Sequence, residues 1–148
     1  MKTYPGPVQG KPLLAKEPYI SVYQQDIPGI ISAIRSGIGY DVFGQISRFF
    51  PFNLQEWASI LHLTERSLQR YKKQNKAFDA LQSEKIIQVL MLYTRGIEVF
   101  GHEPIFHTWL DLPNIALGGI RPKSLLDSAF GIDLLKDELT RIEHGIPA

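Results

Sequence analysis

Apolar residues recur at helical spacing along most of the chain, in stretches that proline and glycine separate. From Asp26 onward, isoleucines follow one another at three- and four-residue intervals, and Pro28 lies where the first turn of a helix tolerates proline. The run from Tyr40 to Phe50 repeats this period until Pro51 ends it. No segment of the sequence alternates apolar and polar residues with a period of two. The pattern therefore predicts an all-α protein.

Two short helices with clear start signals are expected over about residues 53–74. Asn53 can cap the first helix, and Glu56, three residues later, can reach back to complete a capping box. The apolar pattern breaks at His62, and Thr64 then offers a second N-cap. The segment is therefore predicted to form two helices joined by a tight turn.

This spacing resembles the helix-turn-helix pattern, in which a small residue lets the helices approach and apolar residues flank the turn and anchor the second helix. The residues at these positions are Ala58, Leu61, Leu63, Leu68 and Tyr71. His62 stands where that pattern often has glycine, and a non-glycine residue with positive φ carries a steric penalty. The sequence therefore leaves open whether the turn keeps the standard geometry, is rebuilt, or joins the two helices at a different angle.

Basic residues concentrate on the second of these helices. Between Thr64 and Lys76 there are five basic residues and one acidic residue, a local charge of +4 in a chain whose net charge is +1. Such a patch suits DNA phosphates, and Arg, Gln and Ser side chains can also reach base edges; a solvated basic face on an ordinary helix pair is the alternative. The candidate DNA-binding residues are Thr64, Arg66, Ser67, Gln69, Arg70, Lys72 and Lys73.

A long apolar stripe follows an apparent loop at residues 75–82. Ser83 is expected to cap this helix, which should run to about Phe100 and connect the two halves of the core. Gly96 inside it is less favourable than alanine by about 1 kcal/mol, and a close helix crossing would justify it. Gly101 can end the helix.

The last third of the chain is a compact segment that glycine and proline residues divide into short blocks. Gly118 and Gly119 permit a sharp bend, Pro122 can begin a short helix, and Gly131 is expected to separate it from a final helix over residues 132–144. The ordered blocks are Trp109-Leu110, Pro113-Asn114, Ala116-Leu117-Gly118-Gly119, Pro122, Leu125-Leu126-Asp127, Gly131 and Arg141-Ile142-Glu143-His144-Gly145.

These blocks closely resemble the toxin-binding domain of the Xre/MbcA/ParS antitoxins, whose members place an Xre-type helix-turn-helix before it. The resemblance implies an antitoxin of a type II toxin-antitoxin system. Such a protein would bind a cognate RES-domain toxin that acts on NAD and deny its active site to substrate. It would also dimerise and bind palindromic operator DNA as an autorepressor. Arg121 and Leu135 depart from the usual residues of the family without breaking its pattern.

Most apolar residues of this C-terminal stretch are expected in its core, so the polar positions are the better candidates for partner contact. They are Arg121, Lys123, Asp127, Arg141, Glu143 and His144, together with the tail that begins at Gly145. The predicted organisation is an extended or partly disordered arm over residues 1–25, a helical region over 26–100, and a toxin-binding domain over 101–148.

Composition limits the other classes of protein. The chain of 148 residues is 44% hydrophobic, which favours a folded protein, and it has no cysteine for a disulfide or thiolate metal site. It lacks an apolar run of the roughly 20 residues that a membrane span needs, and its start lacks a secretory signal, so a cytoplasmic protein is expected.

An enzyme is the rival class. His107 and Asp111 have the four-residue spacing of two metal ligands on a helix, but no third ligand is evident. The sequence has no nucleophile elbow and no glycine-rich phosphate loop, so no catalytic residue, metal or cofactor is expected. The second rival is a stand-alone helix-turn-helix regulator whose C-terminal domain only dimerises. A neighbouring reading frame that encodes a RES-domain toxin would support the antitoxin, and the absence of such a frame would favour the regulator.

Overall fold

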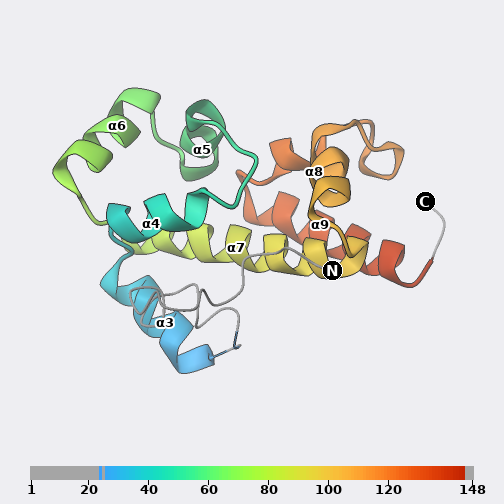
Figure 1. Ribbon diagram of the computed structural model, residues 1–148, viewed down its shortest axis with the longest axis horizontal. Helices are drawn as coiled ribbons and strands as arrows, with labels where there is room; N and C mark the ends of the chain where they lie inside the picture. Colours follow the sequence, from blue (N-terminus) through green and yellow to red (C-terminus); the bar gives the residue numbers. More distant parts are fainter. Residues whose placement is uncertain (1–23, 25, 146–148) are drawn as a thin grey trace. The chain divides into compact units, whose positions relative to one another are not determined.

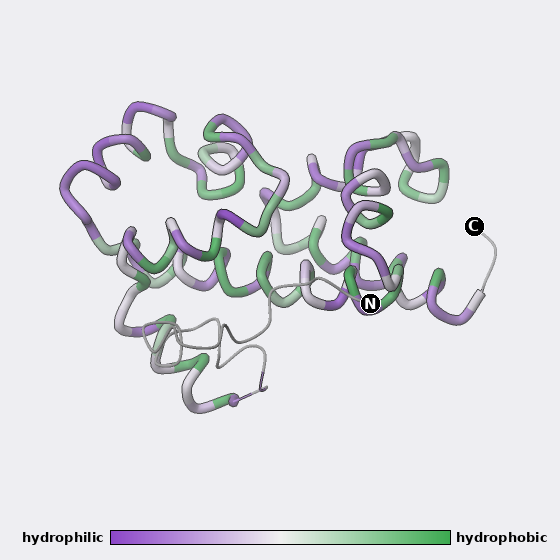
Figure 2. Tube along the Cα trace, viewed as in Figure 1, coloured by the Kyte–Doolittle hydropathy of each residue, from purple (hydrophilic) through white to green (hydrophobic). Residues whose placement is uncertain are grey.

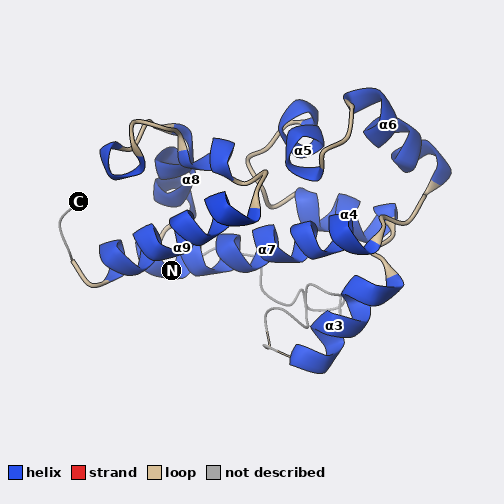
Figure 3. Cartoon of the chain, turned by 180° about the vertical axis from the view of Figure 1, so that it is seen from behind, coloured by secondary structure: helices blue, strands red, loops and turns tan. Residues whose placement is uncertain are grey.

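The computed structural model describes Gln24 and residues 26–145, and that part of the chain is built from helices, without strands (Figure 1, Figure 3). The elements are α3 (Ile27–Ser36), α4 (Tyr40–Ser47), α5 (Leu54–Leu61), α6 (Glu65–Gln74), α7 (Ala80–Phe100), α8 (Glu103–Asp111), the 3-10 helices η1 (Ile115–Leu117) and η2 (Pro122–Leu125), and α9 (Ala129–Glu143). The all-α prediction is confirmed. The predicted arm over residues 1–25 lies outside the described residues, apart from Gln24.

The described chain divides into two compact units within α7. The N-terminal unit comprises α3 to α6 and α7 as far as Met91, and the C-terminal unit continues from Leu92 to Gly145. No helix in the described ranges is long and apolar enough to cross a membrane.

Aromatic rings fill the core of the N-terminal unit. Phe43 of α4 meets Trp57 of α5 edge-on, with 4.9 Å between ring centroids, and meets Phe78 in the same way at 5.2 Å. Tyr71 of α6 stacks on Phe78 with 5.1 Å between centroids. Edge-to-face and offset-stacked rings attract one another beyond the effect of buried area alone. Phe78 therefore joins α4 and α6 through one buried ring.

A buried serine hydroxyl holds the segment that carries Phe78. Ser83 Oγ accepts a hydrogen bond from the Ile38 N–H at 2.9 Å and donates one to the Phe78 carbonyl at 3.4 Å. The Phe78 N–H in turn donates to the Ile38 carbonyl at 2.8 Å. These bonds satisfy main-chain groups that would be costly to bury unpaired.

The prediction that Ser83 caps α7 is wrong. The helix begins at Ala80, three residues before Ser83, and Asp79 supplies the cap. The Gln82 N–H donates to Asp79 Oδ1 at 2.7 Å, and the Asp79 N–H donates to Gln82 Oε1 at 3.2 Å. Aspartate and serine can both cap a helix. Here Asp79 is the cap, and the Ser83 hydroxyl instead accepts the buried Ile38 N–H.

In the C-terminal unit, Phe106 of α8 lies directly against the backbone of α7 at Gly96. A Cβ atom added at Gly96 would overlap the Phe106 ring. The same ring stacks on Phe100 at 5.7 Å and on Trp109 at 6.0 Å. The close helix crossing that the sequence predicts at Gly96 is confirmed.

The final helix begins earlier than predicted. Ser128 caps α9 by accepting the Gly131 N–H at 2.9 Å, so Gly131 lies in the first turn of the helix that starts at Ala129. A Cβ atom at Gly131 would overlap the Leu125 carbonyl of η2. The prediction that Gly131 separates η2 from a helix starting at Ile132 is therefore wrong, because this glycine permits close packing rather than ending an element.

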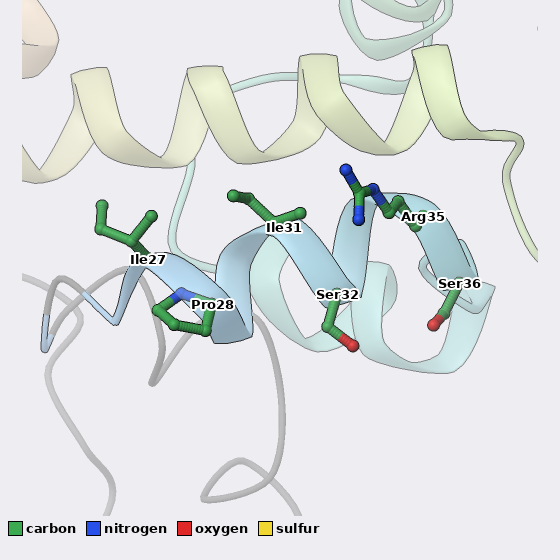
Figure 4. A pocket seen from close by; sticks show the side chains of 6 residues that line it. All are labelled: Ile27, Pro28, Ile31, Ser32, Arg35 and Ser36. Atoms are coloured by element: carbon green, nitrogen blue, oxygen red, sulfur yellow. The ribbon is translucent and has the colours of Figure 1, made fainter.

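The isoleucine stripe of α3 is only partly buried. Ile30 lies in the core, whereas Ile27 and Ile31 remain exposed. Figure 4 shows these two side chains and Arg35 along one side of the helix. They belong to an open hollow whose lining residues are Ile27, Pro28, Ile31, Ser32, Arg35 and Ser36.

We predict that Gly96→Ala destabilises the protein by about 1–3 kcal/mol, because the added methyl group overfills the contact with Phe106. Gly44→Ala is the matched control. A Cβ atom there would meet only ordinary contact, 3.6 Å from a Tyr40 ring carbon, so alanine should stabilise α4 by about 0.5–1 kcal/mol. Urea unfolding followed by circular dichroism measures both changes. A Gly96→Ala variant at least as stable as the wild type contradicts the proposed crossing.

Candidate functional site

Local hydrogen bonds fix the start of each helix in the pair α5 and α6. The Glu56 N–H donates to Asn53 Oδ1 at 2.8 Å, and the Asn53 N–H donates to Glu56 Oε1 at 2.9 Å, which completes the predicted capping box. Thr64 Oγ1 accepts the Ser67 N–H at 3.0 Å at the start of α6. The helix-turn-helix starts predicted at residues 53 and 64 are confirmed.

The turn between these helices passes through His62 in the left-handed conformation, with φ 56° and ψ 41°. The Leu63 N–H donates to the Ala58 carbonyl at 2.9 Å, which closes the end of α5. The sequence left the geometry of this turn open, and the structure shows that His62 takes the positive φ at which the pattern often has glycine. The packed residues around it, Ala58 and Leu61 on α5 and Leu68 on α6, are buried as predicted.

The far end of α6 is tied to α4. Asn75 also adopts the left-handed conformation, with φ 47°, and its Oδ1 accepts the Asp41 N–H at 3.0 Å. The Tyr40 N–H donates to the Lys76 carbonyl at 3.1 Å. The α6 helix is therefore held at both ends within the N-terminal unit.

Four of the predicted DNA-binding side chains lie on one exposed face of α6. Successive residues of an α-helix are about 100° apart, so positions three, four and seven residues apart share a face. This face lies opposite the buried Leu68 and Tyr71, and Figure 2 shows α6 as largely hydrophilic. Its members are Arg66, Gln69, Arg70 and Lys73, which we call the basic face.

The remaining predicted residues of this set take other positions. Thr64 and Ser67 form the cap, with 3.0 Å between their hydroxyl oxygens, and Lys72 lies to one side of the basic face. Lys76, which contributes to the local charge, has its ammonium group 4.7 Å from the centroid of the Tyr71 ring. The structure thus separates a contiguous basic face from residues that build the helix start.

In the C-terminal unit, two predicted toxin-binding residues converge on the end of α8. Lys123 Nζ lies 2.9 Å from Asp111 Oδ1, and Arg121 Nε donates to the Asp111 carbonyl at 3.0 Å. The hydrogen bond from Lys123 holds the pKa of the Asp111 carboxyl below its usual value. Both basic side chains therefore join η2 and its preceding residue to α8.

Two further predicted residues make ion pairs on α9. Arg95 of α7 donates to both carboxylate oxygens of Glu143, at 2.6 Å and 2.9 Å. Arg141 Nε lies 3.4 Å from the carboxylate of Glu138, which is largely buried. The last turn of α9 thus carries Arg141 and Glu143 in ordered positions, although both already have partners within the unit.

The other predicted residues lie beyond these pairs. His144 is exposed after the last turn of α9, and Gly145 ends the helix with φ 69° while its N–H donates to the Ile142 carbonyl at 3.1 Å. Asp127 is half-buried between η2 and α9 in the chain. The structure therefore brings Arg121 and Lys123 together, and separately groups Arg141, Glu143 and His144.

Sequence reasoning missed a set of exposed apolar side chains between α8 and η2. It expected most apolar residues of the C-terminal stretch in the core and did not single out Leu112, Ile115 or Ile120, which are exposed. The signal that could have found them is their place among proline and glycine residues, outside any helical stripe. Exposed apolar side chains in a loop rich in glycine and proline are candidates for contact with a partner protein.

His107 and Asp111, whose spacing is that of two metal ligands on a helix, have different partners in the structure. The Tyr93 hydroxyl lies 2.7 Å from His107 Nε2 and donates to Glu103 Oε2 at 3.1 Å. Partial burial lowers the pKa of the His107 imidazole. Within residues 26–145 no group of three His, Asp or Glu side chains is placed to hold a metal ion.

The Arg95–Glu143 pair predicts a pH dependence of stability. The hydrogen bonds from Arg95 hold the pKa of Glu143 below its ordinary value of 4.5. The pair therefore stabilises the fold fully above pH 4.5, and this stabilisation is lost as the pH falls through the lower pKa that Glu143 has in the folded protein. Glu143→Gln should therefore be less stable than the wild type at neutral pH, with a difference that disappears in acid. Urea unfolding across this pH range measures it.

Asp137→Asn is the matched control for that measurement, because it removes an exposed carboxylate of the same helix outside the pair. The free energy of unfolding of Asp137→Asn should stay close to that of the wild type at every pH. Equal pH profiles for the Glu143→Gln and wild-type proteins contradict a stabilising role for the pair.

Each of the two units matches a known family of protein domains. Residues 29–91 match the Antitoxin Xre-like helix-turn-helix domain, and residues 95–145 match the Antitoxin Xre/MbcA/ParS C-terminal toxin-binding domain. The chain is similar to the protein named Antitoxin Xre of Yersinia enterocolitica, with 26% identity over 118 residues, which cover 79% of this chain and 80% of that protein. It is also similar to the Antitoxin Xre of Photorhabdus laumondii, with 24% identity over 120 residues, or 80% of this chain and 81% of that protein. The chain therefore belongs to the Xre family of antitoxins, with a helix-turn-helix domain followed by a toxin-binding domain.

Proposed function

We propose that this antitoxin neutralises a RES-domain toxin that consumes NAD, by covering the toxin's active site with the C-terminal unit. We also propose that the N-terminal unit binds the operator of the same operon and represses it. The observation that carries both parts is the presence, in one chain, of the toxin-binding domain over residues 95–145 and a basic face on the second helix of a helix-turn-helix. Because its targets would be operator DNA and an NAD-consuming enzyme, the protein would act in the cytoplasm.

The basic face supports the DNA-binding part of the proposal. In helix-turn-helix proteins, the second helix enters the major groove and its exposed side chains contact base edges, while other basic groups contact phosphates. Arg66, Gln69 and Arg70 have the hydrogen-bonding groups for base edges, and Lys73 is suited to a phosphate. A homodimer would place two such helices on a palindromic operator. Thr64, Ser67 and Lys72 remain proposed contacts at the edge of this face.

Ordered charged side chains support the toxin-binding part. Lys123, Arg141 and Glu143 are each held by an ion pair, and Arg121 is held by a hydrogen bond to the end of α8. Side chains that are fixed before binding lose less conformational entropy when the partner arrives. We propose that they form the polar rim of the toxin contact, together with Asp127, His144 and Gly145.

We predict that Arg66→Ala and Arg70→Ala each weaken operator binding by about tenfold or more, since each removes a contact from the basic face. Lys72→Ala should have a smaller effect and reduce the dependence on salt concentration. Lys136→Ala, which removes an exposed positive charge from α9, is the control and should leave operator binding unchanged. Gel-shift titrations at one fixed salt concentration measure the affinities. Unchanged affinity in both arginine variants overturns the proposed DNA surface.

We predict that deletion of residues 132–148 abolishes neutralisation, because it removes the buried Leu135 and Leu139 and with them most of α9. The test is co-expression with the protein that the neighbouring reading frame encodes, followed by cell survival and cellular NAD content. Arg66→Ala is the reciprocal control, since it should lose operator affinity and keep full neutralisation. Full protection of cells by the truncated chain overturns the proposed function.

A further inference from the structure

We propose that the loop over residues 112–121 is the anchor of the toxin contact, and that it inserts Ile115 into an apolar pocket on the toxin. This inference rests on the proposed function and adds the surface that carries the binding energy. The proposed polar residues would then surround the anchor rather than form the contact by themselves. We call this segment the anchor loop.

The anchor loop exposes apolar side chains to an unusual degree. Ile115 has 92% of its surface exposed, Leu112 has 55% and Ile120 has 43%. Single exposed apolar residues are common on protein surfaces, but here three lie within nine residues of one loop. Figure 2 shows hydrophobic positions in this part of the chain after α8. Removing such a side chain from water is the main favourable contribution to most protein–protein association.

Hydrogen bonds hold the anchor loop in one conformation. The Asn114 N–H donates to the Ile120 carbonyl at 3.1 Å, and the Asn114 carbonyl accepts the Gly119 N–H at 2.8 Å. Asn114 Oδ1 also accepts the Ala116 N–H at 2.8 Å. Gly118 and Gly119 return the chain with φ of 77° and 81°, which a side chain would disfavour. Ile115 is therefore presented by a closed and internally bonded loop.

This preorganisation is what an interface anchor requires. Ordering a flexible loop on binding consumes part of the interaction free energy, and a loop that is already closed avoids that loss. Binding energy at protein interfaces also concentrates in a few side chains that fill pockets, surrounded by polar residues that exclude water. At the base of the anchor loop, Arg121 and Lys123 are both held against Asp111. The apolar tip and its charged base thus match the centre and rim of an interface.

A toxin fits this loop better than a second copy of the chain does. The anchor loop lies wholly within residues 95–145, which match the toxin-binding domain. In a two-fold dimer the same surface must be complementary to itself, which favours broad faces that pack on each other. A closed loop with one almost fully exposed isoleucine at its 3-10 turn is a convex feature, and it requires a concave apolar pocket on a different surface.

The test compares Ile115→Asp with Leu81→Asp in the full-length chain. Leu81 is 79% exposed in the second position of α7, so its substitution introduces the same charge on a similarly exposed apolar residue of the N-terminal unit. The probe is the purified protein encoded by the neighbouring reading frame, and calorimetric titration gives the dissociation constant. We expect Ile115→Asp to weaken binding by at least about thirtyfold and Leu81→Asp by less than about threefold.

Two further variants keep the test independent of folding defects. Ile115→Ser removes the apolar side chain without adding charge and should weaken binding by about tenfold, whereas Ile115→Val should bind within about threefold of the wild type. Circular dichroism and thermal unfolding establish that each variant is folded. All four variants should retain operator affinity, because none of them alters the basic face.

The outcomes separate this inference from the proposed function. If the wild-type chain does not bind the neighbouring protein, the proposed function and the anchor fail together. If the wild type binds and Ile115→Asp binds equally well, the anchor alone is refuted. Loss of a homodimer in Ile115→Asp, seen by analytical ultracentrifugation, with unchanged toxin affinity would assign the loop to contact between copies and overturn the inference.

Discussion

The hydroxyl of Ser83 is the interaction on which the N-terminal unit depends. It accepts the buried Ile38 N–H, and the paired main chains of Ile38 and Phe78 are thereby held together. Phe78 can then place its ring against Phe43 and Tyr71, which joins α4 to α6. A buried main-chain group without a partner is expensive, so this small polar contact fixes how the aromatic core is assembled. The orientation of α6, and with it the basic face, follows from that core.

The two proposed recognition surfaces would rest on different physical principles. The basic face of α6 lies opposite Leu68 and Tyr71, so the same helix both completes the core and presents charge to the solvent. Long-range electrostatic attraction suits a polyanionic partner, whose bound counterions are released on contact. The anchor loop instead presents Ile115, whose burial depends on the shape of the partner's surface. The chain thus combines an electrostatic surface with a surface of shape and apolar contact.

The charged residues of the C-terminal unit also have a structural role. Glu143 holds α9 to α7 through Arg95, and Asp111 holds Arg121 and Lys123 at the base of the anchor loop. Exposed ion pairs contribute little free energy by themselves, but they restrict the side chains that take part. Gly96 and Gly131 allow the helices behind these pairs to pack closely. The surface around the anchor loop is therefore ordered from the core outward.

The sequence by itself determined the all-α class, the capping box at Asn53, the second cap at Thr64 and the close crossing at Gly96. Each of these depends on residues near one another or on the absence of a side chain. The sequence also carried the family pattern of the last third of the chain. Only the tertiary structure decided that Ser83 serves a distant main-chain group and that Gly131 lies inside α9. It also decided that Leu112, Ile115 and Ile120 stay exposed while Leu110 and Leu126 on either side of their loop are buried. Capping is local, whereas burial depends on which segments meet. A periodic pattern identifies the apolar residues but does not show which of them remain uncovered.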